Sequence, residues 1–417
     1  MLDIELIRKE SDRVKQSVAA KNIDPKVVED FLTVDGEWRE IVKQADELRA
    51  SLNKLSKERK VDEAKTVKEN LKKLEQDLPA LEQKRNALLD KLPNLPDPEW
   101  PVGKNAEANK ILRTVGKKQS AAADDFEPKD YLTLGKNLGV IDTERASKVA
   151  GTRFGYIMGD LVLLEFALVQ LAMETLVKEG FVPVIPPAML KREVYKAIGR
   201  LAHDQESERY FLPEDNLFLA GSSEHTLVPM HMDEVLDEKT LPRRYVGFST
   251  CFRREAGSYG KDTKGILRVH QFDKVEMIVF TKPEDSEKEH KFLLALQERL
   301  MQALELPYQV VQNCTGDMGW TDYAQYDIEA WLPSENRYRE THSCSNTTDF
   351  QTRGANIKLR TSNVEHRTVY VHALNATGFA IGRTLIAIIE NYQTVKGTIT
   401  VPKVLQKYVG KKEIKNA

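Results

Sequence analysis

Residues 250–265 read TCFRREAGSYGKDTKG, a polar loop that carries glycines and cations. Two apolar runs rich in strand-forming residues flank this loop, at 245–252 and 266–280. Apolar runs separated by a glycine-containing polar segment are typical of antiparallel hairpins. The pattern therefore predicts a hairpin whose long, mobile tip suits phosphate binding.

The predicted hairpin also gathers charged and aromatic side chains on one face. Side chains two apart on a strand share a face, so Arg253 and Glu255 are expected to project together. The same spacing groups Phe272, Lys274 and Glu276. Such a set can hold a triphosphate, a purine and a small ligand with an ammonium group. A purely structural hairpin is the alternative, but its many charges would then need buried partners.

The composition sets broad limits on the chain. Its 417 residues allow about two domains. The net charge is −2, so any nucleic-acid surface must come from a local cluster of Lys and Arg. The first five residues, MLDIE, are acidic, and no apolar run reaches membrane length. We therefore expect neither a signal peptide nor a membrane partner.

The three cysteines are Cys251, Cys314 and Cys344. They are scattered, without the paired spacing of a zinc site or a disulfide framework. This spacing predicts reduced thiols, no zinc and a cytoplasmic location.

A long charged segment with a narrow apolar stripe precedes the hairpin. Apolar residues recur at steps of three and four from Trp38 to Leu55, and again from Ala64 to Leu92. This pattern predicts an antiparallel two-helix coiled-coil arm over about 37–92, projecting into solvent, with a turn near 57–62. Pro79 predicts a kink in the second helix. A dimerisation coiled coil and a solvated helical hairpin are the alternatives.

The proline-rich segment 92–101 predicts a rigid connector and a boundary between domains 1–100 and 101–417. After it, helical and strand patterns mix, which favours an α+β domain built on an antiparallel sheet. The expected helices span 131–150, 159–179, 284–304 and 381–392. The expected strands lie near 181–185, 218–220, 245–252, 266–280, 308–312, 325–332, 338–345 and 369–374.

Several motifs indicate a family resemblance that extends over nearly the whole chain. FRREAG at 252–257, followed by RVHQFDKVE at 268–276, closely resembles the second signature motif of class II aminoacyl-tRNA synthetases in its seryl form. Residues 180–187 resemble the first motif, and residues 378–384 resemble the third. Three further segments are of the seryl type, namely CTGD at 314–317, YRETHSCSN at 338–346 and NYQ at 391–393.

This resemblance implies an antiparallel sheet flanked by helices in a catalytic domain, with the arm belonging to an N-terminal tRNA-binding domain. It implies an ATP-dependent ligase that activates L-serine to seryl-adenylate and transfers it to tRNA(Ser). The implied cofactors are ATP and Mg²⁺, and the implied assembly is a homodimer. A catalytically inactive relative that binds tRNA or protein, and a ligase that loads a carrier protein, are the alternatives.

The resemblance also assigns roles in ATP binding. It implies that Arg253 contacts the α-phosphate and the amino-acid carboxylate, and that Glu255 accepts from the adenine amino group. Phe272 and Arg383 would cover the two faces of the adenine. The implied catalytic residues are Arg253, Glu255 and Arg383, and the implied Mg²⁺ ligands are Glu340 and Ser343. The full ATP-binding set is Arg253, Arg254, Glu255, Val269, His270, Phe272, Glu340, Thr341, His342, Ser343 and Arg383.

Serine and tRNA are assigned in the same way. Glu276 and Thr377 are implied to hold the serine hydroxyl, whose hydrogen bonds would reject amino acids that lack it. The full serine-binding set is Ser222, Ser223, Glu224, Arg253, Glu276, Asn375 and Thr377. The implied tRNA contacts are phosphate-directed cations of the arm. They are Arg49, Lys54, Lys57, Arg59, Lys60, Lys65, Lys68, Lys72 and Lys73.

Some positions depart from the family pattern. Ser222 stands where threonine is usual, and Thr377 where serine is usual. Arg254 replaces a small serine, and strand alternation predicts that it points away from the ATP. Gly354 stands where an arginine commonly follows Arg353. Residues 199–204 fit the pattern weakly and are expected to form a mobile loop without an assigned role.

Overall fold

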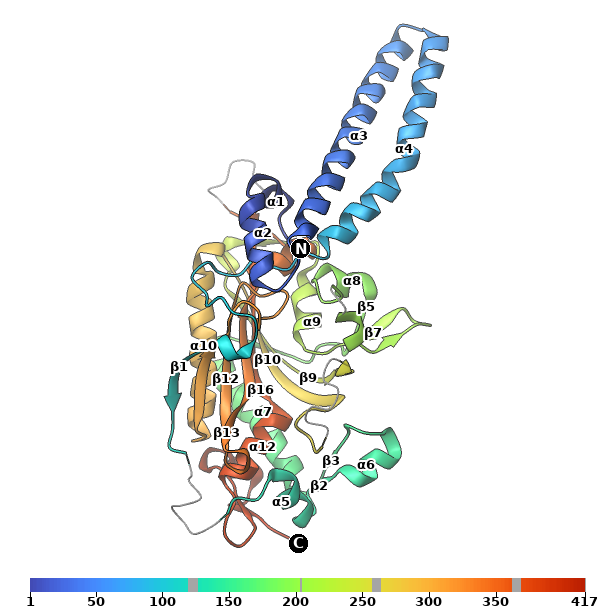
Figure 1. The fold of residues 1–417 in the computed structure, drawn as a ribbon. Coiled ribbons are helices and arrows are strands. Elements are labelled where there is room, and N and C mark those ends of the chain that lie inside the picture. Colours follow the sequence, from blue (N-terminus) through green and yellow to red (C-terminus); the bar gives the residue numbers. More distant parts are fainter. Residues whose placement is uncertain (119–126, 203–204, 257–263, 362–368, 417) are drawn as a thin grey trace. The chain divides into compact units, whose positions relative to one another are not determined.

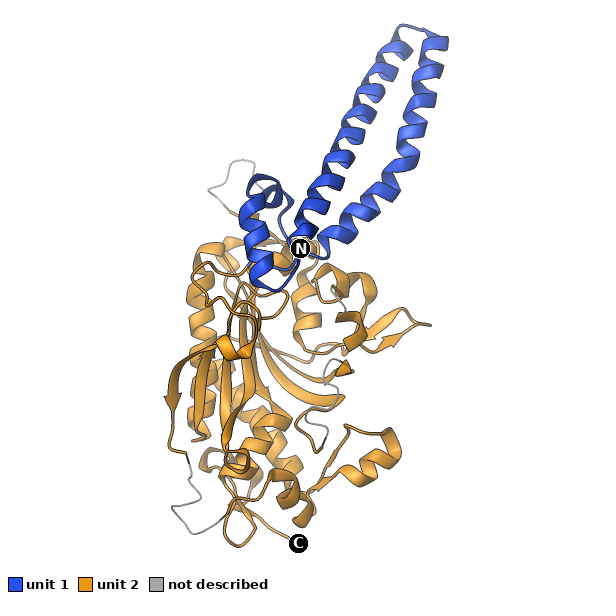
Figure 2. Cartoon of the chain, in the orientation of Figure 1, with its two compact units in different colours: residues 1–95 blue, residues 96–417 orange. Residues whose placement is uncertain are grey.

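The computed structural model describes residues 1–118, 127–202, 205–256, 264–361 and 369–416 (Figure 1). The chain divides into two compact units, residues 1–95 and residues 96–417 (Figure 2). The tip of the predicted hairpin, 257–263, and residues 203–204 of the unassigned loop lie outside the described residues.

The first unit is helical. Its helices are α1 (Ile4–Lys9), α2 (Ser11–Ala20), α3 (Lys26–Lys57) and α4 (Val61–Leu89). The predicted two-helix arm is confirmed as α3 and α4, but α3 begins about eleven residues earlier than expected. Pro25 immediately precedes α3, where its fixed φ suits a helix start. The first turns of α3 bury Val28 and Phe31 and contact α1 and α2. The apolar stripe of this one helix therefore packs against α1 and α2 at its start and against α4 along the arm.

A buried carboxylate joins three helices at the base of the arm. Asp35 is 1% exposed and accepts from Arg8 at 2.7 and 2.9 Å and from Arg85 Nε at 2.7 Å. Burial raises the pKa of Asp35, but the two guanidinium groups more than offset this and lower it overall. The Arg85 guanidinium also lies 4.5 Å from the centre of the Trp38 ring. This cluster fixes where the two long helices start to pair.

Pro79 lies inside α4 without ending it. The residue is exposed, so the backbone carbonyl that loses its helical donor can bind water. Figure 1 shows α4 curving between the tip of the arm and its base, as a proline inside a helix predicts.

The second unit is built on an eight-stranded sheet in the order β1-β11-β12-β13-β16-β10-β9-β4, antiparallel except for the pairing of β4 with β9. The strands are β1 (Lys110–Val115), β11 (Tyr308–Gln312), β12 (Ala324–Leu332), β13 (Arg337–Asn346), β16 (His372–Ala380), β10 (Gln271–Thr281), β9 (Arg243–Phe252) and β4 (Val182–Val184). Helices α7 (Asp160–Lys178), α10 (Ser286–Ala303) and α12 (Ile381–Asn391) pack against the sheet and complete the main apolar core. The predicted α+β class is thus confirmed.

Shorter elements surround this sheet. They are α5 (Tyr131–Asn137), β2 (Ile141–Asp142), α6 (Thr143–Ala150), β3 (Tyr156–Ile157), β5 (Met189–Lys191), α8 (Arg192–Ala197), β6 (Phe211–Leu212), β7 (Leu217–Leu219), α9 (Glu224–Leu227), β8 (Val235–Asp237), α11 (Phe350–Gly354), β14 (Lys358–Arg360), β15 (Val369–Tyr370), β17 (Ile399–Thr400), α13 (Gln406–Val409) and β18 (Glu413–Ile414). The single helix expected over 131–150 is wrong. Gly139 has a φ of +67° and ends the first piece, and the Asp142 side chain caps the second.

The central hairpin is β9 and β10, which pair in register with Phe272 opposite Cys251 and Glu276 opposite Gly247. Strand β9 ends at Phe252 and β10 begins at Gln271, five residues later than predicted. Arg253 and Glu255 therefore lie beyond the strand, and strand alternation is not what brings them together.

Two further findings concern the described residues. None of their helices is both long and apolar enough to cross a bilayer. Cys251, Cys314 and Cys344 are all buried and carry free thiols.

Candidate functional site

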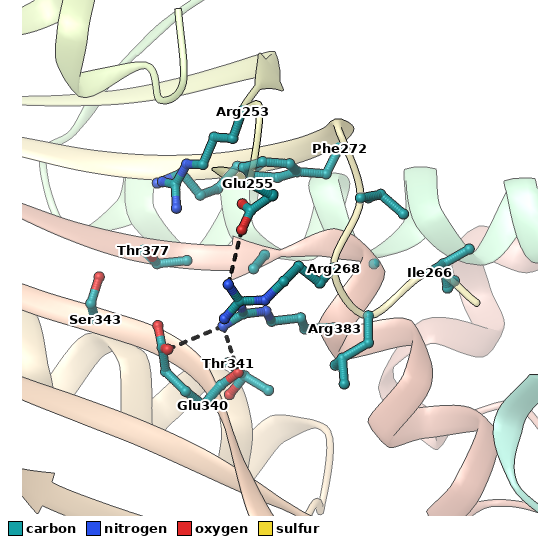
Figure 3. Close-up of a pocket in the computed structure, with 15 residues that line it drawn as sticks. Arg253, Glu255, Ile266, Arg268, Phe272, Glu340, Thr341, Ser343, Thr377 and Arg383 are labelled. Atoms are coloured by element: carbon teal, nitrogen blue, oxygen red, sulfur yellow. Dashed lines mark hydrogen bonds and ion pairs between the residues drawn. The ribbon is translucent and has the colours of Figure 1, made fainter. Parts of the chain in front are cut away.

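A cavity opens where the end of the β9–β10 hairpin faces β13, β16 and the start of α12 (Figure 3). We call it the outer pocket. Its lining combines four cations and two carboxylates with one aromatic ring and small apolar groups. It is formed by Arg253, Glu255, Ile266, Leu267, Arg268, Val269, Phe272, Lys274, Glu340, Thr341, Ser343, Thr377, Ala380, Gly382 and Arg383.

Two ion pairs line the outer pocket. Arg268 Nη1 lies 3.0 Å from Glu255 Oε2, and Arg383 Nη1 lies 3.2 Å from Glu340 Oε2 (Figure 3). Arg383 also donates to the Glu340 carbonyl at 3.0 Å. Glu255 has a φ of +52°, an uncommon conformation for this residue type. This turn, rather than a strand, brings its carboxylate into the pocket.

Arg253 is anchored on several sides. Its Nε donates to the Gly221 carbonyl at 3.2 Å, and its guanidinium carbon lies 5.3 Å from the centre of the Phe272 ring. Its backbone nitrogen donates to the His270 carbonyl at 3.0 Å, and His270 Nδ1 lies 3.0 Å from the Arg253 carbonyl. His270 therefore holds the backbone that presents Arg253.

The pKa values of two neighbouring carboxyl groups shift in opposite directions. The Glu340 side chain is half exposed; partial desolvation raises its pKa, but Arg383, with Arg253 and Arg268, more than offsets this and lowers it overall. Burial and the nearby Glu340 charge raise the pKa of Asp327 well above its usual value. Glu340 is therefore ionised at neutral pH. Its carboxylate and the Ser343 hydroxyl are hard oxygen donors on one wall, which suits a Mg²⁺ ion that also binds phosphates.

A second cavity, the inner pocket, adjoins the outer one. The two share Arg253, Glu255, Lys274 and Ser343. The remaining lining of the inner pocket is Arg200, Gln205, Glu208, Arg209, Glu224, His225, Glu276, Asp317, Gly319, Asp322, Gln325, Ser345 and Asn375.

Glu276 lies deep in the inner pocket, with only 1% of the residue exposed. The Lys274 ammonium lies 2.5 Å from its Oε2 atom. Burial raises the pKa of Glu276, and Lys274 opposes this only in part. Thr377 is its register partner on β16, and the Asn375 amide nitrogen two residues away is buried without a partner among the described residues. Glu276 and Asn375 line the inner pocket, while Thr377 lines the outer one, so polar groups that can bind a small hydroxylated ligand lie along both.

Some residues implied to bind ligand lie behind the pockets. Ser222 Oγ accepts from the Glu224 backbone nitrogen at 3.1 Å, and Ser223 Oγ lies 2.8 Å from Ser249 Oγ. Both serines are almost fully buried and line neither pocket. Their hydroxyls are used to shape the loop that presents Glu224.

Arg254 and His342 also lie outside both linings. The Arg254 guanidinium lies 5.8 Å from the centre of the Tyr210 ring and lines neither pocket, although the residue lies beyond β9, where strand alternation no longer applies. His342 Nε2 lies 2.9 Å from the Gly378 carbonyl, and Nδ1 lies 2.7 Å from Thr341 Oγ1. Burial lowers the pKa of His342 to about 4, so the neutral ring with its proton on Nε2 fits these contacts.

The structure adds residues that the motifs did not assign to a ligand. Arg268, Lys274 and Arg200 all line a pocket and pair with a carboxylate. The first two were visible as cations on the hairpin, whereas Arg200 lies in the weakly matching loop. The missing arginine at Gly354 also has a reason, because a Cβ atom there would lie 1.9 Å from the Ala197 carbonyl oxygen.

A third recess lies beside Phe272 and contains a pair of acidic side chains, Glu165 of α7 and Asp273 of β10. Burial and the hydrogen bond with Asp273 raise the pKa of Glu165 to about 8, from an ordinary value of 4.5. Folding therefore binds a proton here between these two pH values. The resulting stabilisation is complete below about pH 4.5 and is lost as the pH rises through about 8.

We expect Glu165→Gln to remove this pH dependence. Between pH 6 and pH 9 the free energy of unfolding should fall by about 1–2 kcal/mol more in the natural chain than in the variant, after allowance for partial exposure. Urea unfolding at several pH values measures the difference. Glu174→Gln is the control on the same helix, since the pKa of Glu174 is lowered to about 2 and it does not titrate in this range. Parallel curves for the natural chain and Glu165→Gln would contradict the prediction.

Comparison with known proteins agrees with this geometry. Residues 1–96 match the seryl-tRNA synthetase N-terminal domain, and residues 210–392 match the class II tRNA synthetase core domain (G, H, P, S and T). The serine–tRNA ligase of Fervidobacterium nodosum is 41% identical over 429 aligned positions, which cover 100% of this chain and 99% of that protein.

Two solved structures are similar over the whole chain. The seryl-tRNA synthetase of Pyrococcus horikoshii complexed with ATP has a TM-score of 0.93 and 39% identity, covering 100% of both chains. The cytoplasmic serine–tRNA ligase of Naegleria fowleri in complex with AMP has a TM-score of 0.91 and 33% identity, covering 100% of this chain and 99% of that one. The chain therefore belongs to the seryl-tRNA synthetase family, within class II of the aminoacyl-tRNA synthetases.

Proposed function

We propose that this protein is a serine–tRNA ligase that activates L-serine with ATP and transfers the seryl group to tRNA(Ser). The observation that carries the proposal is the junction of the two pockets. Arg253 lines both, so one guanidinium can contact a nucleotide in the outer pocket and an amino acid in the inner one. Serine–tRNA ligases that are similar over the whole chain support the same function.

The first step joins the two ligands at Arg253. The serine carboxylate attacks the α-phosphorus of ATP, and pyrophosphate leaves with the electron pair of the broken bond. A carboxylate is already ionised at neutral pH, so no protein base is needed. The fork of donors on Arg253 can bind the carboxylate and the α-phosphate together, which orients the attack and neutralises developing charge. Arg268 and Arg383 supply further positive charge in the outer pocket.

The adenine is assigned to the apolar part of the outer pocket. Phe272 offers a ring face for stacking, and Arg383 would cover the opposite face. Glu255 would accept from the adenine amino group after exchanging its contact with Arg268. A Mg²⁺ ion would be held by Glu340 and Ser343 and would screen the phosphate charge. In the described part of the chain, no group of three or more His, Cys, Asp and Glu side chains is arranged as a metal site.

In the second step, a hydroxyl of the terminal ribose of tRNA(Ser) attacks the seryl carbonyl, and AMP leaves. We assign tRNA binding to the arm formed by α3 and α4, within the proposed N-terminal domain. Its outer part carries the nine predicted cations from Arg49 to Lys73, and all of them are exposed and suited to phosphate contacts.

A homodimer in the cytoplasm completes the proposal. Large apolar side chains stay exposed on α7 and around β4, including Phe166 at 59%, Val182 at 54% and Ile185 at 86%. A patch of this kind is typical of a self-complementary interface between two copies of a chain. The buried free thiols support a reducing compartment.

The decisive test is ATP–pyrophosphate exchange with serine, alanine, glycine, threonine and cysteine in parallel, followed by charging of tRNA(Ser). We expect exchange with serine above all, and charging of tRNA(Ser). Absence of exchange would favour the inactive relative, and exchange without charging would favour the carrier-protein ligase.

Replacing Glu276 with alanine is expected to remove the preference for serine. The hydroxyl of serine then loses a buried acceptor, so kcat/KM for serine in the exchange reaction should fall by about a hundredfold. The value for alanine should change little, because alanine has no hydroxyl to bind. Glu329→Ala is the control, since this carboxyl lies on the same sheet, bonds to Gln309 and lines neither pocket. Equal losses for both amino acids would contradict this role.

A further inference from the structure

Arg200, in the loop that the motifs leave unassigned, reaches into the inner pocket and pairs with Glu224. Its Nε and Nη2 atoms donate to Glu224 Oε1 at 3.0 and 2.5 Å. The Arg200 side chain is only 14% exposed and that of Glu224 only 6%. The guanidinium is largely shielded from water, and two of its nitrogens donate to one oxygen. The contact is therefore a buried ion pair and not a solvated surface pair.

The contacts of Glu224 are strongly asymmetric. Gln351 Nε2 is a third donor to the same Oε1 atom, at 2.7 Å. Among the described residues, no hydrogen bond or ion pair to Oε2 is present. Burial raises the pKa of Glu224, but Arg200, Gln351 and Lys274 together more than offset this and lower it overall. Glu224 is thus an ionised carboxylate with one oxygen saturated and the other open toward the pocket it lines.

We propose that Arg200 is a positioning residue for amino-acid binding, which fixes Glu224 so that its free Oε2 atom receives the α-ammonium of the substrate. The inference rests on the proposed function. The planar fork of arginine places two donors on one oxygen and so sets the rotation of the carboxylate. Arg200 itself touches neither the ammonium nor the reacting atoms. Its effect passes through Glu224 and concerns only ligands that carry the amino group.

The test compares two stable mimics of the adenylate by isothermal titration calorimetry with the full chain. One is 5′-O-[N-(L-seryl)sulfamoyl]adenosine, and the other is its 3-hydroxypropanoyl analogue, which lacks the amino group. We expect the natural chain to bind the amino compound about ten- to a hundredfold more tightly, as for hydrogen bonds to a charged group. Arg200→Gln should reduce this ratio to within about threefold of one and leave the affinity for the analogue within about threefold of the natural value.

Two further variants control the experiment. Arg243→Gln removes a partly exposed arginine that bonds to Thr240 outside both pockets, and its affinity ratio should stay natural. Arg200→Lys keeps the charge and should retain part of the affinity ratio between the amino compound and its analogue. If Arg200→Gln does not fold, Arg200→Lys replaces it in the test. An unchanged ratio, or an equal loss for both compounds, would overturn the inference. The proposed function fails separately, if the natural chain lacks serine-dependent exchange.

Discussion

Replacing Arg253 with alanine is expected to lower kcat/KM for serine-dependent ATP–pyrophosphate exchange by about a hundred- to a thousandfold, the usual cost of removing one preorganised donor. Arg253 lies where the two pockets join, and its contacts with Gly221 and Phe272 hold the guanidinium in place before ligands arrive. Because it serves both ligands, KM for serine and KM for ATP should rise together while kcat falls. Arg253→Lys should recover only part of the rate, since an ammonium cannot bridge two anions as a planar fork does.

The adjacent residue supplies the matched control. Arg254 lies outside both pockets, with its guanidinium near Tyr210. Arg254→Ala removes the same charge one residue away and should keep the exchange rate within about fivefold of the natural value, as is usual for changes away from the chemistry. Equal losses in the two variants would mean that the hairpin acts through its general positive charge, and the proposed role of Arg253 would be wrong.

Much of the fold follows from local patterns, while the ends of its elements do not. The alternation along β9 and β10 and the narrow stripe of the arm are repeated over many residues, so both could be predicted from sequence. The start of β10 at Gln271 could not be predicted in this way, because residues 266–270 are as apolar as the strand that follows. The left-handed conformation of Glu255 is equally hidden, since glutamate has no preference for it.

The site shows a similar division. The family resemblance assigned Arg253, Glu340 and Arg383 to one site, and all three line the outer pocket. They lie on, or directly after, regular elements of the sheet and its helices. The hydroxyl of Ser223 bonds to Ser249 instead of facing the pocket, and that choice depends on a neighbour 26 residues away. The partner of Arg200 is likewise on another element, so no local signal could reveal the pair.

Shortening the arm is expected to separate the two steps of the reaction. Arg49 Nη2 lies 2.8 Å from Glu75 Oε1 across the two helices, so this pair can form the new end of a shorter hairpin. Replacing residues 50–74 with a short glycine–serine turn removes the cations from Lys54 to Lys73 and keeps the base cluster around Asp35. Serine-dependent exchange should stay within about twofold of the natural rate. By contrast, kcat/KM for charging tRNA(Ser) should fall by about a hundredfold or more, because the arm no longer neutralises tRNA phosphates.

A second variant distinguishes charge from shape in the arm. Replacing Lys65, Lys68, Lys72 and Lys73 with glutamine leaves the helices in place but removes four cations from α4. If these lysines bind phosphates, the logarithm of tRNA affinity should depend less steeply on the logarithm of salt concentration, by roughly 0.7–0.9 for each phosphate that is no longer neutralised. Natural charging with an unchanged salt slope would limit the arm to shape recognition, because this variant keeps the helices and removes only charge. The chain shortened at 50–74 gives the stricter test. If it charges tRNA(Ser) at the natural rate, the outer part of the arm does not take part in tRNA binding.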